Sequence, residues 1–519
     1  MESVVKFVKT TATIIFSNGT SYEIPLVNKN YMTTDLKNYC TSIRINEKLY
    51  SPSGSNIVGN ICGNTMSLEI TSYDKLLISS NEESVYYGFM NDSAVIEIRC
   101  STDENNDIYM GRYFVDTWEN GADSSSSGSV SISCVDLLSK IKSIALGKIR
   151  LRRNLSLKDY LVMIIDLLNE TLPDTMKILY DPAELDIFVS SNYPWQLYFN
   201  NVDRDNIETI FNNIAKDTVS YLWIDRSRYL RLDNLLDDKG SEAVSTLSGS
   251  LNLFAYGLQS GDIDKYSGVK VTYTTDINLE DKQVLKLSGY KLYKGNNNIS
   301  NATLNVDKVF NINSIEIECE NGQAICISFE HYKRSIDLII KSDKETKADI
   351  YVYGTVLNEI TDSITKYKDD NNKNSLVEIE NKILRKEFIN TYVDGLIQLM
   401  SMKNNIIYAE GYINPAVKLG DLIYVNGRKL AIDAYYKVIG LDFTLGINYR
   451  CKATLLRTVS ITPSADSILY NNNLLLNKSL SGEIVDTNNL VILSDEDESI
   501  VYSQIGTELE NLNRVLKGV

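Results

Sequence analysis

The sequence has few of the residues on which most enzyme sites depend. Among 519 residues there are one histidine (His331), seven prolines and three tryptophans. A single histidine excludes metal sites built from several histidines and argues strongly against Ser/His and Cys/His nucleophile pairs. The patterns GxxxxGK[ST], GxGxxG, GxSxG and HExxH do not occur either. These absences argue against the common catalytic classes, and we expect no cofactor.

The chain also lacks positive charge and long apolar runs. Its 52 Lys and Arg residues face 68 Asp and Glu residues, for a formal net charge of −16. An acidic chain is poorly suited to bind nucleic acid or an anionic membrane surface. No run approaches the roughly 18 apolar residues of a membrane span. We therefore expect no specific nucleic-acid binding, no membrane anchor and no signal peptide.

Seven cysteines are present, an odd number without any CxxC pair. Several of them lie in strand-like runs, so reduced thiols in a protein core are the favoured interpretation. Cys319, Cys326 and His331 supply three metal ligands at most, and a fourth is not evident. Residues 103–107 imitate the start of a calcium loop, but Ile108 stands where glycine is required. The sequence therefore predicts no metal site.

Two acidic pairs and three tryptophans are the remaining candidates for chemistry. The pairs at 237–238 and 369–370 lie in polar loops, where solvation is the simplest interpretation, although a glycosidase also uses two carboxylates. Trp118, Trp195 and Trp223 are residues that stack on sugars, but each lies in a strand-like context that favours burial. We expect no catalytic residues among them.

Strand-like runs and turns dominate the chain. Asn-Gly pairs at 18–19, 321–322 and 426–427 lie between such runs and predict hairpins, because a type I′ turn needs positive φ at both central residues. Further strands are predicted from β-branched and aromatic residues at 67–73, 94–100, 110–118, 129–135, 269–274 and 449–457.

Helices are fewer. Ser156 is placed to cap a helix over 157–169, and Asp203 or Asp205 to cap one that reaches Lys216. A longer amphipathic segment covers about 376–402. Strands, then helices with strands, then strands with one long helix predict an α+β, β-rich multidomain chain. Composition shifts place the domain boundaries so that the chain divides into 1–150, 151–240, 241–458 and 459–519.

Three local patterns resemble the hub proteins of phage tails. The first is Gly-Arg-Tyr-Phe-Val-Asp-Thr-Trp at 111–118, followed by a strand that ends in Asp-Leu-Leu at 136–138. The second covers 195–232, where a helix leads into a hairpin bearing Trp-Ile-Asp at 223–225. The third is a long helix leading into Asn-Pro-Ala-Val-Lys-Leu-Gly-Asp at 414–421. Their order along the chain is similar to that of the baseplate hub, or tail-tip hub, family.

That resemblance implies both a fold and a role. Domains 1–150 and 241–458 are expected to be tail-tube-like β-barrels, the second with a long helix, and 151–240 a small α/β domain between them. The implied protein is a homotrimeric adaptor without catalysis, which joins a sixfold tail tube to a threefold spike or fibre tip. Its partners would be its own copies, a tail tube or distal tail protein, and a spike or tail-tip protein. It would be made in the bacterial cytoplasm and assembled into a virion tail or a tail-like bacteriocin.

Two other functions stay open at this point. A glycan-binding tail-tip adhesin would use exposed aromatic residues, and a carboxylate-dependent cell-wall hydrolase would use an acidic pair. Oligomeric state separates the hub from the hydrolase, and binding to cell-wall glycans separates the hub from the adhesin. Whether the tail contracts, and whether the particle is a phage or a bacteriocin, is not contained in these patterns.

The C-terminal extension, 459–519, contains one candidate contact surface. An acidic stretch at 494–499 precedes a predicted terminal helix, as suits the positive end of a helix dipole. Apolar residues then recur at intervals of 3, 4, 3 and 4, which is a heptad seam of about two heptads. The alternative is that the seam folds back on its own barrel domain. We expect it instead to contact another chain, through Tyr502, Ile505, Leu509, Leu512 and Leu516.

Overall fold

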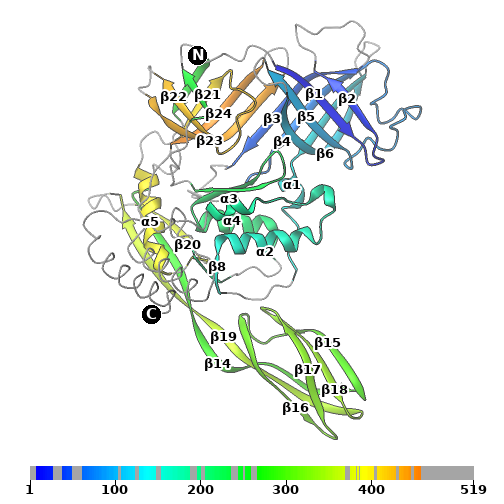
Figure 1. Ribbon diagram of the computed structural model, residues 1–519, viewed down its shortest axis with the longest axis vertical. Coiled ribbons are helices and arrows are strands. Elements are labelled where there is room, and N and C mark those ends of the chain that lie inside the picture. Colours follow the sequence, from blue (N-terminus) through cyan, green and yellow to red (C-terminus); the bar gives the residue numbers. More distant parts are fainter. Residues whose placement is uncertain are drawn as a thin grey trace, which may run out of the picture.

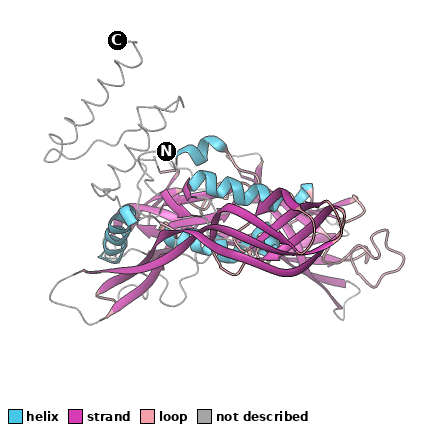
Figure 2. Cartoon of the chain, turned by 90° about the horizontal axis from the view of Figure 1, so that it is seen from below, coloured by secondary structure: helices cyan, strands magenta, loops and turns pink. Residues whose placement is uncertain are grey.

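The computed structural model describes residues 8–26, 38–49, 61–102, 107–122, 128–147, 153–187, 196–199, 205–234, 243–248, 252–258, 266–368, 375–381, 383–384, 386–401, 406–427, 432–445 and 449–457. Strands make up most of these residues and helices are few (Figure 2). The described chain is therefore α+β and β-rich, as the residue patterns predict.

Seven strands near the N-terminus form a curled antiparallel sheet with the order β3-β4-β7-β6-β5-β1-β2. Leu26, directly after β2, bridges to Cys40 in β3 and brings the last strand back toward the first. Alternate residues of β4 are buried, so one face of the strand lines an apolar interior. The strands are β1 (Val8–Ile15), β2 (Ser21–Pro25), β3 (Asn38–Lys48), β4 (Thr65–Ser72), β5 (Val95–Thr102), β6 (Ile108–Ala122) and β7 (Gly128–Val135).

A second curled unit comes from the C-terminal half of the described chain. Its strands lie in the order β12-β22-β23-β24-β21-β13. The ring of Tyr256 in β13 packs so close to Gly427 in β22 that a Cβ there would lie 2.5 Å from the ring, so the two ends of the row approach each other. The strands are β12 (Ser245–Ser248), β13 (Leu253–Leu258), β21 (Ile406–Gly411), β22 (Leu422–Gly427), β23 (Ile432–Leu445) and β24 (Arg450–Arg457).

The two curled units share one continuous sheet. β23 pairs antiparallel with β3, from Gly440 opposite Lys48 to Leu445 opposite Ile43. This pairing joins the units into a 13-stranded sheet within the described residues. In Figure 1 the N-terminal unit (blue) and the second unit (orange) lie side by side at the top of the molecule.

A small α/β unit lies directly beneath this sheet (Figure 1). Ser156 caps α2 by accepting a hydrogen bond from the Asp159 N–H, as the sequence predicts. The cap of α4 is Asn206, which accepts from Thr209 N–H, and not Asp203 or Asp205. The elements are α1 (Leu137–Ile141), β8 (Arg153–Ser156), α2 (Leu157–Asn169), the 3-10 turn η1 (Asp174–Met176), α3 (Pro182–Ile187), β9 (Gln196–Phe199), α4 (Ile207–Asp217), β10 (Ser220–Ile224) and β11 (Leu230–Asn234).

A long ribbon leaves the α/β unit and carries a separate module. β14 (Gly268–Leu292) and β19 (Thr346–Tyr367) pair antiparallel along nearly their whole length. Near the body, β20 (Leu376–Asn381) adds to β14, and α5 (Lys386–Ser401) packs beside the ribbon. At the far end lie β15 (Gly295–Thr303), β16 (Val309–Cys319), β17 (Ala324–His331) and β18 (Ser335–Ser342), as Figure 1 shows.

The module has its own apolar core. The sheet β16-β19-β14 faces the sheet β15-β18-β17, and side chains such as Ile312, Leu338 and Ile350 fill the space between them. A second, larger core contains side chains from both curled units, the α/β unit and α5. Within the predicted domain 241–458, the described residues therefore divide between two cores.

Besides the cap of α4, three sequence predictions need correction. The pair 321–322 does form a turn, but β16 and β17 belong to different sheets and face each other across the module's core instead of forming a hairpin. The pair 426–427 lies within β22 itself, where Asn426 pairs with Asp433 and Gly427 with Ile432 of β23. Of the predicted helical segment, 376–381 is strand β20, because parallel pairing with β14 supplies backbone partners that a local pattern does not reveal. The hairpin at 18–19 and the six further predicted strands are confirmed.

Candidate functional site: the joint between sheet and α/β unit

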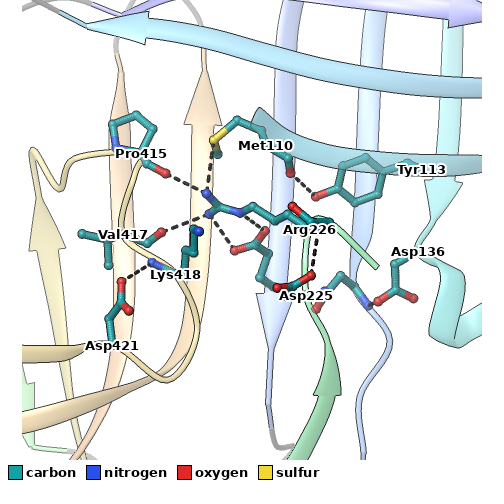
Figure 3. Close-up of polar contacts among 12 residues, drawn as sticks. Met110, Tyr113, Asp136, Asp225, Arg226, Pro415, Val417, Lys418 and Asp421 are labelled. Atoms are coloured by element: carbon teal, nitrogen blue, oxygen red, sulfur yellow. Dashed lines mark hydrogen bonds and ion pairs between the residues drawn. The ribbon is translucent and has the colours of Figure 1, made fainter. Parts of the chain in front are cut away.

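The three family-like patterns of the sequence meet in one place. The hairpin β10–β11 carries Trp223 and Asp225, and the segment before β22 carries Gly420 and Asp421. The turn from β7 into α1 carries Asp136 on the adjoining side (Figure 3). A cleft of ≈ 340 Å³ opens between these elements. We call this region, formed by 223–233, 415–421, Asp136 and the facing residues of β3 and β23, the joint.

Arg226 lies at the centre of the joint. Its Nε donates to Oε1 of Glu47 at 2.7 Å, and its Nη2 donates to Oε2 at 2.9 Å. Nη1 also donates to the carbonyl oxygen of Pro415 at 2.8 Å, and Nη2 to that of Val417 at 3.1 Å. Only 7% of the Arg226 side chain and 2% of the Glu47 side chain are exposed. One buried guanidinium therefore ties together β3, the turn of the β10–β11 hairpin and the segment before β22 (Figure 3).

The surroundings of Arg226 keep it charged. Burial by itself would lower its pKa, but the charge of Glu47 and the hydrogen bonds to it raise the pKa above the ordinary value. The guanidinium also lies over the ring of Phe443, 5.5 Å from the ring centroid, which adds a cation–π contact from β23. A planar, five-donor group suits this site because several acceptors converge on it in fixed directions.

A second buried ion pair closes the other side of the joint. Lys437 Nζ in β23 lies 2.6 Å from Oδ2 of Asp233 in β11, and both side chains are almost fully buried. The two pairs connect the hairpin β10–β11 to both curled units, because Glu47 comes from the first unit and Lys437 from the second. Burying four charges is costly unless each is paired, so the arrangement favours a single docking position of the α/β unit.

Two aspartates of the sequence patterns shape the loops of the joint. Asp225 Oδ1 accepts from the N–H groups of Ser227 at 2.8 Å and Tyr229 at 2.9 Å, and Oδ2 pairs with Arg231 at 2.9 Å. Asp421 Oδ2 accepts from Lys418 N–H at 2.7 Å. Burial raises the pKa of both carboxyls. These bonds fix tight turns, so the carboxyls serve the backbone conformation.

Gly420 is required by its neighbour Trp223. Its φ is +87°, a conformation that L side chains rarely adopt. A Cβ at this position would lie 3.0 Å from Cη2 of the Trp223 ring. The Gly-Asp and Trp-x-Asp elements, almost 200 residues apart, are therefore two halves of one contact.

Asp136 holds the turn from β7 into α1. Its Oδ1 accepts from Ser139 N–H at 2.9 Å, which caps α1, and its Oδ2 accepts from Asn64 N–H at 2.8 Å. Burial raises the pKa of Asp136 to about 6, and these hydrogen bonds offset only part of the rise. An unfolded aspartate titrates near about 4. The folded chain therefore binds this proton more tightly, and the resulting stabilisation is present below about pH 4 and lost as the pH rises to about 6.

Asn381, at the end of β20, makes a further contact of the α/β unit, here with the ribbon. Its Nδ2 donates to the carbonyl oxygen of Asp217 at 2.9 Å, and its Oδ1 accepts from Leu384 N–H at 3.1 Å. Tyr392 in α5 donates to the carbonyl oxygen of Lys216 at 3.1 Å. The long helix α5 begins five residues later, at Lys386. Asn381 instead connects the end of β20 to the end of α4.

The chemistry of the joint is that of a mechanical connection. Its ion pairs and carboxyls are engaged with protein partners. In the part of the chain that the structure describes, no group of three His, Cys, Asp or Glu side chains is arranged to hold a metal ion. Among the described helices, none has the length and apolar character that crossing a membrane requires.

The aromatic candidates have structural contacts. Trp223 is buried in the joint, and the Trp118 indole N–H donates to the carbonyl oxygen of Leu77 at 3.3 Å. Cys319 and Cys326 lie on opposing sheets of the module, and His331 Nε2 lies 3.2 Å from the Phe310 carbonyl oxygen. Other candidates lie outside the described residues: Trp195, 103–106, 237–238, 369–370 and the seam Tyr502, Ile505, Leu509, Leu512 and Leu516.

The sequence analysis missed the central ion pair. A signal was present in and directly after β3, where Ile43, Ile45, Glu47 and Leu49 are all buried. A glutamate at an inward position of a strand needs a buried cation. The sequence contains no indication that this cation is Arg226, because strand alternation identifies the face and not the partner.

Comparisons with known proteins give a structural likeness and no sequence match. No family model matches the chain, and no curated protein matches its sequence. The solved tail protein from Neisseria meningitidis MC58 shares 9% identity at a TM-score of 0.45, over 86% of this chain and 96% of that chain. The 43 kDa tail protein of prophage MuSo2 from Shewanella oneidensis shares 11% identity at a TM-score of 0.44, again over 86% and 96%. The prophage tail protein gp18 from Listeria monocytogenes EGD-e shares 10% identity at a TM-score of 0.42, over 90% and 99%. These structural neighbours are phage tail proteins.

Proposed function

We propose that this chain is a structural hub at the tip of a phage tail or a tail-like particle. In this role it is a homotrimeric adaptor that joins a sixfold tail tube to a threefold spike or fibre tip. The observation that carries the proposal is the antiparallel pairing of β23 with β3, which sets two curled β-units side by side in one sheet. Each copy then offers two similar surfaces to the adjoining ring of tail-tube subunits.

Symmetry explains why this arrangement suits an adaptor. Three copies around an axis present six curled units toward a sixfold tube, while the chain as a whole keeps threefold symmetry toward a spike. The joint supports this geometry because two buried ion pairs hold the α/β unit at a fixed position beneath both units. A net charge of −16 per copy also discourages adhesion of DNA that passes through a tail.

The partners follow from the same proposal. The curled units contact a tail tube or distal tail protein, and the opposite end contacts a spike or tail-tip protein. The seam Tyr502, Ile505, Leu509, Leu512 and Leu516 is proposed to contact another chain. Replacing Leu509 and Leu512 by Glu tests that contact, since the monomer should keep its fold while trimer or particle assembly fails. Unchanged assembly, or loss of monomer stability, contradicts it.

Oligomeric state is the direct test of the hub. Sedimentation and mass photometry at micromolar concentration, together with a reconstruction of the assembled particle, should give three copies on the tail axis. At the end of the second curled unit, Phe254 is half exposed and packs edge-on against Tyr412, with ring centroids 4.5 Å apart. We expect Phe254→Lys to weaken the trimer, and Tyr87→Lys, at an exposed aromatic of the first unit, to leave it intact. A dimer or hexamer on the axis refutes the proposal.

The absence of catalysis is part of the proposal and has its own test. Purified protein is incubated with peptidoglycan and cell-wall polysaccharide, and release of soluble fragments is measured. We expect none above the level of a mock purification. Turnover that persists through purification and disappears on replacing the acidic pair at 237–238 or at 369–370 refutes the structural role.

A further inference from the structure

The module at the end of the ribbon has four edge strands, and three of them carry polar protection. β14 presents Lys282, Lys286 and Lys291, while β15 contains three consecutive asparagines at 296–298 and β16 alternates Glu316 with Glu318. Charged and strongly polar edge residues hinder the addition of a further strand. These three edges are therefore unfavourable docking sites.

β17 is the exception. Its exposed side chains include Ile325 (62% exposed), Ile327 (47%) and Phe329 (47%). Its one acidic residue is Glu330, next to last in the strand, and it contains no Lys, Arg or Pro between 324 and 331. Within the described residues it pairs only with β18, so the backbone groups along its other edge have no strand partner. A free edge that exposes apolar side chains is a template for one more strand.

A bulge increases the exposure of this strand. Cys326 pairs with Ile340 and Ser328 with Ile339, so Ile327 has no residue opposite it on β18. A bulge changes the direction in which the side chain of its unpaired residue points. Ile327 is thus presented outward together with Ile325, and an incoming strand would cover both. Beyond the bulge the faces exchange, because Phe329 pairs with the buried Leu338 and so lies on the opposite face of the strand from Ile325.

The module is also placed and charged for contact with another protein. From 284 to 356 its nine Lys and Arg residues balance nine Asp and Glu residues, so the excess negative charge of the chain lies elsewhere. The ribbon that carries it is exposed on both faces over 358–363 and holds the module away from the body (Figure 1). A neutral, outlying domain meets a protein partner without the repulsion that the acidic body would add.

We infer that β17 is a docking edge for an extended segment of another protein. The segment adds as a strand antiparallel or parallel to β17 and places aliphatic or aromatic side chains at every second position against Ile325 and Ile327. Main-chain hydrogen bonds supply affinity, and the two isoleucines supply specificity. A glycan is the weaker fit, because Ile325 and Ile327 are aliphatic and offer no aromatic ring for stacking.

The experiment selects a partner by its chemistry. A random eight-residue peptide library is selected on the full chain. The selection is repeated on Ile325→Lys/Ile327→Lys and on Ile325→Thr/Ile327→Thr, which keeps β-branched residues at both positions. A matched control, Asn296→Lys/Asn298→Lys, changes the polar edge β15. Thermal unfolding confirms that each variant is folded.

We expect enriched peptides with apolar residues at alternate positions and no internal proline. Their binding should fall at least tenfold on both β17 variants and stay unchanged on the β15 control. Added peptide should slow amide hydrogen exchange along β17. No enrichment, apolar residues at helical spacing, or binding that both β17 variants retain overturns the inference.

Two further outcomes also overturn it, since they assign the edge to a different occupant. The first is self-association of the parent chain that the β17 variants lose, which assigns β17 to a second copy. The second is slow exchange along β17 without peptide that truncation after Arg457 abolishes, which assigns it to the chain's own C-terminal segment.

Discussion

Arg226→Met is the perturbation that most directly tests the joint. The substitution removes the guanidinium and leaves Glu47 as a carboxylate with 2% of its side chain exposed. Breaking one partner of a buried pair costs about 3–5 kcal/mol, largely because the other charge stays buried. The carbonyl groups of Pro415 and Val417 also lose a donor. We expect the free energy of unfolding to fall by about 4 kcal/mol.

A surface ion pair provides the matched control. Arg99 Nη1 lies 2.7 Å from Oδ2 of Asp107, and 52% and 64% of the two side chains are exposed. Both pairs join an arginine to a carboxylate at 2.7 Å. The pair of Arg226 is buried and contacts both oxygens of Glu47, whereas that of Arg99 is exposed and contacts one oxygen of Asp107. An exposed pair contributes at most about 1 kcal/mol, so Arg99→Met should have a small effect.

The double variant Arg226→Met/Glu47→Leu separates the two causes of the loss. It removes the unpaired buried carboxylate of Glu47. The carbonyl groups of Pro415 and Val417 still lack their donor, at a cost of about 1–3 kcal/mol. We expect the double variant to be about 2 kcal/mol more stable than Arg226→Met alone. Urea unfolding followed by tryptophan fluorescence is the assay, since Trp223 lies in the joint. The reasoning is refuted if Arg226→Met costs no more than Arg99→Met, or if the double variant is no more stable than the single one.

Three further predictions concern other parts of the molecule. Asp136→Asn should flatten the pH dependence of stability between about pH 4 and 6, measured by urea unfolding, because burial raises this pKa to about 6; an unchanged pH profile contradicts this. Gly420→Ala should destabilise the chain by about 1 kcal/mol more than Gly19→Ala, since both glycines have positive φ but only at Gly420 would a Cβ meet the Trp223 ring; equal losses refute the contact. Replacing 280–355 by an Asn-Gly turn should leave the main unfolding transition and the trimer unchanged, because the module has its own core; a lower transition temperature shows that the cores are coupled.

Local signals were sufficient for most elements of this chain. The Ser156 cap and the apolar spacing of the following residues define α2, and the Asn-Gly pair at 18–19 defines the first hairpin. Both depend on residues only a few positions apart. The segment 376–381 was assigned to the wrong element, because its strand conformation depends on β14, more than 100 residues away.

The joint shows the same limit. The Trp-x-Asp hairpin, the Gly-Asp turn and Asp136 were each identified from sequence, but nothing in those patterns states that the first two touch. Gly420 is needed because of Trp223, and Glu47 is tolerated in a core because of Arg226. In both cases the choice of residue at one position depends on a residue far away in the sequence. Such a dependence becomes visible only when the tertiary structure shows both residues in contact.

The sequence by itself determined the class of the fold, most of its strands, its capped helix α2 and the absence of the usual catalytic patterns. Tertiary structure alone decided that β3 pairs with β23, that one core unites both curled units with the α/β unit, and that a separate module stands on a ribbon. The physical reason is that alternation and capping are local properties of the backbone. Strand partners and buried charges are instead chosen by which distant surfaces can bury apolar area and satisfy each other's polar groups.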